Sequence, residues 1–121
     1  MSYDYWLMRA RNPIRDAADV DEPNVAPIGS YLEIKRLVQK VRPKFQWNDT
    51  ERYCWFKDDS EDVLLHVGYA ESGPEFLTIT VKAWWRENFQ EQLVALATSL
   101  GLFAFDPQHV LVVGGVVEPT S

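Results

Sequence analysis

The sequence predicts an α+β domain, a two-layer sandwich in which two helices pack on one face of a mainly antiparallel five-stranded sheet. Two segments show the spacing of apolar residues that is typical of helices, and five others have the composition or the alternation of strands. Their order is β-α-β-β-β-α-β, which favours helices grouped on one side of an antiparallel sheet. With 121 residues, the chain is expected to form a single domain over residues 1–121.

The first strand is expected at residues 3–10, where aromatic and apolar side chains alternate onto both faces. A strand that is apolar on both faces is predicted to lie inside the sheet and not at its edge. The following stretch, residues 11–29, contains three prolines and several acids, with one candidate helical turn near residues 14–20. Connections of this length in a small domain are often functional or mobile.

Two amphipathic helices are predicted. The first begins at Ser30, a favourable N-cap, and Glu33 completes a capping box three residues later. It ends before Pro43, because the residue that precedes a proline is pushed out of the helical region. The second helix covers about residues 86–100 and is expected to stop at Gly101 in the left-handed conformation.

The remaining strands are predicted at residues 50–57, 63–69, 76–83 and 109–113. Polar turn segments separate the first three of these strands, so an antiparallel meander is expected. Because side chains alternate across a strand, Leu77, Ile79 and Val81 are assigned to the core face. The face away from the helices is expected to carry Tyr53, Trp55, His66, Thr78, Thr80 and Lys82.

Aromatic side chains on that open face have three interpretations. They form a binding surface, they pack across neighbouring strands, or residues 11–29 or the C-terminal tail cover them. Trp84 and Trp85 raise a similar question at the end of the meander. Either one indole caps the core while the other is exposed as an interface residue, or both pack inside.

The sequence contains no motif for catalysis, cofactor binding or metal binding. It has two histidines and one cysteine, and no glycine-rich phosphate loop, nucleophile elbow or paired metal-ligand spacing. His66 lacks an evident catalytic partner, with Glu51 as the nearest candidate. Cys54, on the core face, is expected to behave as a small hydrophobe. We therefore expect no enzyme activity, no cofactor and no metal.

The acids 58–62 lie in a predicted turn that lacks the glycine and the terminal glutamate of an EF-hand loop. They are interpreted as a solvated turn or as a negative patch, which the acids of residues 11–29 would extend. The candidate partner-binding residues are Asp16, Asp19, Asp21, Glu22, Tyr53, Trp55, Asp58, Asp59, Glu61, Asp62 and His66.

The charge balance limits the partners. The chain has 18 acidic and 12 basic side chains, a formal net charge of −6. Such a charge repels nucleic acids and anionic membranes, and it suits a basic protein partner or simply solubility. No signal peptide or membrane-spanning stretch is evident, and a lone cysteine gives no sign of a disulfide-stapled secreted fold. We expect a cytoplasmic location.

The opening residues 1–7 (Met-Ser-Tyr-Asp-Tyr-Trp-Leu), the acidic loop and the aromatic meander resemble small bacterial single-domain proteins of poorly characterised families. Some of these are immunity proteins encoded beside secreted toxins. The resemblance lies in size, charge and layout over most of the chain, so it carries over no functional residue. It implies a non-enzymatic, acidic domain that binds and neutralises a basic toxin. The alternative is a small-molecule-binding domain or an enzyme that uses a cleft between residues 11–29 and the sheet.

Overall fold

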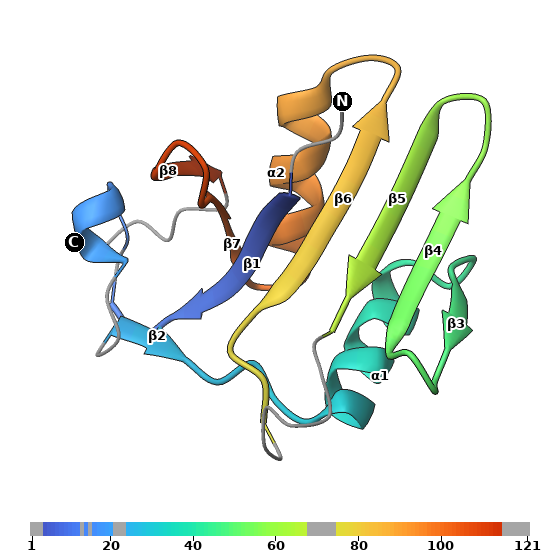
Figure 1. Ribbon diagram of the computed structural model, residues 1–121, viewed down its shortest axis with the longest axis horizontal. Coiled ribbons are helices and arrows are strands. Elements are labelled where there is room, and N and C mark those ends of the chain that lie inside the picture. The colour runs from blue at the N-terminus through green and yellow to red at the C-terminus, as the bar shows by residue number, and fades with distance from the viewer. Residues whose placement is uncertain (1–3, 13, 15, 21–23, 68–74, 115–121) are drawn as a thin grey trace.

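A computed structural model describes residues 4–12, 14, 16–20, 24–67 and 75–114. It confirms the α+β class, with two helices and an open antiparallel sheet, but the sheet has eight strands where five were predicted. Figure 1 shows the elements: β1 Asp4–Ala10, η1 Ala17–Asp19, β2 Val25–Ala26, α1 Tyr31–Val41, β3 Gln46–Asn48, β4 Tyr53–Lys57, β5 Glu61–His66, β6 Ile79–Trp85, α2 Phe89–Ser99, β7 Phe103–Asp106 and β8 Leu111–Gly114.

The strand order is β3-β4-β5-β6-β1-β7-β8, and β2 pairs with the end of β1. All of these pairings are antiparallel. Strand β1 lies between β6 and β7, which confirms the prediction that this strand is internal. The predicted meander is also confirmed, because β4, β5 and β6 are neighbours in sequence order.

Both helices lie behind the sheet in the view of Figure 1. Helix α1 begins as predicted: the Glu33 N–H donates to Ser30 Oγ at 3.3 Å, and the Ser30 N–H donates to Glu33 Oε1 at 3.2 Å. Helix α2 begins at Phe89, later than predicted, because β6 continues through Trp85. Gly101 has φ +70, so the predicted left-handed stop is confirmed.

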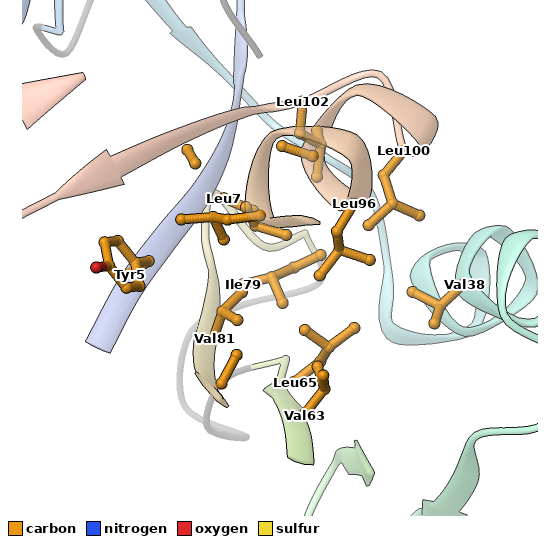
Figure 2. Close-up of a cluster of buried hydrophobic side chains, with 14 of the residues drawn as sticks. Tyr5, Leu7, Val38, Val63, Leu65, Ile79, Val81, Leu96, Leu100 and Leu102 are labelled. Atoms are coloured by element: carbon orange, nitrogen blue, oxygen red, sulfur yellow. The ribbon is translucent and has the colours of Figure 1, made fainter. Parts of the chain in front are cut away.

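The main core lies between the helices and the face of the sheet that they cover (Figure 2). Leu65, Ile79 and Val81 point from the sheet toward Val38 of α1 and Leu96 of α2, and all five side chains are almost fully buried. The alternation predicted for β6 is therefore confirmed from Ile79 onward. The assignment of Leu77 to the core is wrong, because the strand begins two residues later and Leu77 is 50% exposed.

Three strands were missed, and the predicted strand at residues 50–57 begins too early. Residues 49–52 form a turn instead, in which the Glu51 N–H donates to Asn48 Oδ1 at 3.0 Å and Arg52 takes a positive φ of 58. The missed strands β2 and β3 have two and three residues, too few to show an alternation. Strand β7 is buried on both faces, so its four residues do not alternate between apolar and polar.

Candidate partner-binding surface

The sheet face away from the helices, called here the outer face, is divided into two halves. The described part of residues 11–29 covers the half formed by β1 and β7. Ile14 is fully buried there in a second apolar cluster with Met8, Phe103 and Phe105. Ala17, Val20 and Val25 are partly buried against the same cluster. This segment, called here the covering segment, thus shields Phe103 and Phe105 from solvent, and neither phenylalanine was predicted to lie on this face.

Hydrogen bonds around Asn24 hold the covering segment together. The Asn24 side chain accepts from the Asn12 N–H at 2.7 Å and donates to the carbonyl oxygen of Asp19 at 2.8 Å. The Arg11 N–H donates to the Asn24 carbonyl at 2.8 Å. Asn24 itself is buried, so these bonds satisfy a side chain that is out of contact with water.

The other half of the outer face is formed by β4, β5, β6 and the first part of β1. Strand register places its side chains in rows. In one row Tyr53 lies opposite His66, His66 opposite Thr80, and Thr80 opposite Trp6. We call this half the aromatic half, and it comprises Trp6, Tyr53, Trp55, Leu64, His66, Thr80, Lys82 and Trp84.

Exposure differs among the rings of the aromatic half. Tyr53 and Trp55 are partly buried and pack against each other, with ring centroids 5.5 Å apart. Trp6 is 39% exposed and Trp84 is 50% exposed. The largest accessible apolar area therefore belongs to two tryptophans that were not among the candidate residues. Alternation within residues 3–10 places Trp6 on the other face of the strand from Tyr5 and Leu7. Because both faces of that strand are apolar, the sequence does not show which of them is the outer face.

The adjacent tryptophans settle the question raised by the sequence. Trp85 is buried in the main core, with its ring centroid 5.3 Å from that of Phe89, whereas Trp84 is exposed on the outer face. One indole therefore caps the core and the other is available at the surface.

His66 lies between Tyr53 and Thr80, as the predicted face assignment requires. Thr78 lies just before β6 and so outside this row. Glu51, the nearest candidate for a second acid–base group, lies in the turn before β4 and is exposed. Neither it nor Thr78 is paired with His66 in the sheet.

The candidate acids do not form one patch. Asp58, Asp59, Glu61 and Asp62 belong to the turn between β4 and β5 and to the start of β5, at the upper right of Figure 1. Asp16 is the N-cap of η1 and Asp19 is its last residue, and η1 lies at the far left of the same view, so these two acids do not extend the turn acids. Asp21 and Glu22 lie outside the described residues.

The turn acids also differ in their surroundings. Asp58 Oδ1 accepts hydrogen bonds from the Ser60 N–H, the Ser60 hydroxyl and the Glu61 N–H, all within 2.9 Å. Asp62 lies opposite Lys57 in the β4–β5 pair. All three aspartates are exposed, but Asp58 has a structural role in the turn, while Asp59 lies in the same turn and Asp62 at the start of β5.

The described residues that could act as a nucleophile or as metal ligands show few of the features that these roles require. Burial raises the pKa of the Cys54 thiol to about 12, which disfavours the nucleophilic thiolate. Within the described ranges, no three His, Cys, Asp or Glu side chains gather as metal ligands would. Neither α1 nor α2 has the length and apolarity that a membrane span requires, and this applies to every helix in the described part of the chain.

A buried carboxylate holds the turn between β7 and β8. Asp106 Oδ1 accepts from the N–H groups of Gln108 and His109 at 2.9 and 3.2 Å, and its Oδ2 lies 2.7 Å from Nδ1 of His109. Burial acts to raise the pKa of Asp106, but the hydrogen bonds from His109 and Gln108 outweigh it and lower the pKa below its ordinary value. Ionised Asp106 therefore stabilises the fold.

We expect Asp106→Asn to reduce the free energy of unfolding near neutral pH by about 1–3 kcal/mol, the usual range for hydrogen bonds to a charged group. A depressed folded-state pKa gives stability that is present above the unfolded value and is lost as the pH falls through the folded value. Urea unfolding at about pH 7 and about pH 3 should thus show a gap between the two proteins that narrows in acid. An equal gap at both pH values would contradict this role.

Comparisons with protein-family models, curated proteins and solved structures found no match to this chain.

Proposed function

We propose that this chain is a non-enzymatic protein-binding domain, and that it acts as an immunity protein that neutralises a basic toxin. The observation that carries the proposal is the division of the outer face. Ile14 and the other described residues of the covering segment pack over the phenylalanines of one half, while Trp6 and Trp84 of the aromatic half are accessible. Exposed aromatic side chains on one sheet face are suited to binding a protein, and tryptophan is enriched among interface residues that dominate affinity.

Charge supports a basic partner. The net charge is −6. At the edge of the aromatic half, the exposed Asp62 lies opposite Trp84 in the β5–β6 register, and Asp59 is exposed in the adjoining turn. Acids that rim an apolar centre speed association with a basic protein and disfavour acidic competitors. The aromatic half would then supply affinity, and the turn acids would supply rate and selectivity.

The alternative, a ligand cleft between residues 11–29 and the sheet, has less support. The space at that place is filled by the apolar contacts of Ile14 with Met8, Phe103 and Phe105. A ligand site there would require convergent polar groups around an open space, and packed hydrocarbon provides neither.

The test pairs this chain with the product of a neighbouring gene that encodes a secreted toxin. Co-expression should restore growth, and Trp84→Ala should weaken the purified complex by about 2 kcal/mol or more. The matched control is Leu32→Ala, because Leu32 is equally apolar and exposed but lies on α1, behind the sheet. Replacing Asp59 and Asp62 with lysine should slow association and reduce its salt dependence.

A toxin that binds with unchanged affinity to the Trp84→Ala protein would exclude the aromatic half as the docking surface. If no neighbouring toxin is inhibited at all, the immunity function is excluded.

A further inference from the structure

A second surface feature lies between the end of α1 and the β4–β5 turn; Figure 1 shows both of these elements on the right. It is a cavity of about 280 Å³, the volume of about nine water molecules at liquid density. Ligand pockets usually begin near this size, so the cavity suits a small molecule. Phe45 and Phe56 form part of its lining, and their rings are almost parallel, with centroids 5.9 Å apart.

Charges of both signs surround these rings. Arg42 and Lys44 line the cavity from the segment that follows α1, and Asp58 and Glu61 line it from the β4–β5 turn. Hydrogen bonds from Ser60 are the main cause that lowers the pKa of Asp58, and the charge of Lys44 adds to the effect.

These opposite charges do not form ion pairs with one another. Within the described ranges, no ion pair joins Arg42 or Lys44 to Asp58 or Glu61. Asp58 is held in place by its bonds to Ser60 and Glu61, so its carboxylate cannot swing toward the cations without breaking the turn. A cavity thus remains, with an aromatic wall, two cations on one side and two carboxylates on the other.

We propose that this cavity binds a small zwitterion with an apolar body, of the chemistry of an apolar α-amino acid. The ligand carboxylate would lie against Arg42 and Lys44, its ammonium group against Asp58 and Glu61, and its apolar body against the phenylalanines. Guanidinium groups match carboxylates well, and ammonium ions are attracted to carboxylates and aromatic faces. This role for Asp58 and Glu61 is independent of the protein-binding proposal.

The test is an NMR titration of the full chain with L-phenylalanine, 2-phenylethylamine and 3-phenylpropionate. These three molecules share the ring and differ in their charged groups. L-phenylalanine should produce saturable shifts at Lys44, Phe56 and Glu61, and each singly charged analogue should bind about tenfold more weakly, because one charged contact is lost. The absence of saturable shifts with L-phenylalanine would overturn the proposal, and so would equal binding of either analogue.

Variants with matched controls locate the site. Lys44→Gln and Glu61→Gln should each weaken binding of L-phenylalanine about tenfold. Lys40→Gln and Asp59→Asn, which remove exposed charges of the same sign nearby but outside the cavity, should leave it unchanged. If the controls weaken binding equally, or if the cavity variants have no effect, the zwitterion does not bind here. Thermal melts check that each variant is folded.

Discussion

Trp85→Ala is expected to destabilise the protein by about 3–5 kcal/mol, the usual cost of truncating a buried aromatic side chain. Trp85 is 7% exposed and packs against Phe89 in the main core. A small domain has a total stability of about 5–15 kcal/mol, so this single change would remove a large share of it. Urea unfolding followed by circular dichroism measures the loss.

The matched control is the neighbouring residue. Trp84 has the same side chain and the same strand, but it is half exposed on the outer face. Trp84→Ala is expected to cost only about 1–2 kcal/mol, because much of its apolar surface is already in contact with water. Similar losses for the two variants would mean that Trp84 is covered, and the aromatic half would then no longer be available to a partner.

Ile14→Ala is expected to cost about 2–5 kcal/mol, although Ile14 lies in a connecting segment and not in a helix or strand. Its side chain is fully buried against Met8, Phe103 and Phe105. Removing it leaves a cavity that the surrounding side chains cannot fill completely, and it weakens the contact that holds residues 11–29 on the sheet. Proteolysis within residues 11–29 should then become faster.

Leu77→Ala is the control for Ile14. Leu77 also lies in a connecting segment, but it is 50% exposed, so its truncation is expected to cost clearly less than that of Ile14. The binding of a hydrophobic dye should rise for Ile14→Ala, as Phe103 and Phe105 become accessible, and should not rise for Leu77→Ala. Equal stability losses and equal dye binding would show that residues 11–29 do not cover this half of the sheet.

The two pairs of variants address one question, namely which apolar surface of the outer face is occupied by the chain itself. If Ile14 covers its half and Trp84 stays open, the accessible aromatic area is confined to the aromatic half, which β4, β5, β6 and the first part of β1 form. The acids of the β4–β5 turn rim that half, whereas Asp16 and Asp19 do not. A search for partner contacts should therefore begin at Trp84 and Asp62, which lie opposite each other.

Features that depend on neighbours a few positions apart could be predicted from the sequence. The cap of α1 needs only Ser30 and Glu33, three residues apart, so its signal is complete in the sequence. The left-handed stop at Gly101 is equally local. Alternation within β4, β5 and β6 was also sufficient to place Tyr53, Trp55 and His66 on one face, because one face of this meander is polar enough to contrast with the other.

Which parts of that face remain open depends on contacts between segments that are far apart in the chain. Strand β7 shows no alternation of apolar and polar residues, because both of its faces are buried. The helical layer buries Ala104, and the segment that contains Ile14 buries Phe103 and Phe105. The segment and the strand lie about 90 residues apart in the chain, and no local pattern records a contact of that separation. The same limit applies to the acids, whose grouping into two distant clusters follows from the order of strands in the sheet and not from their spacing in the sequence.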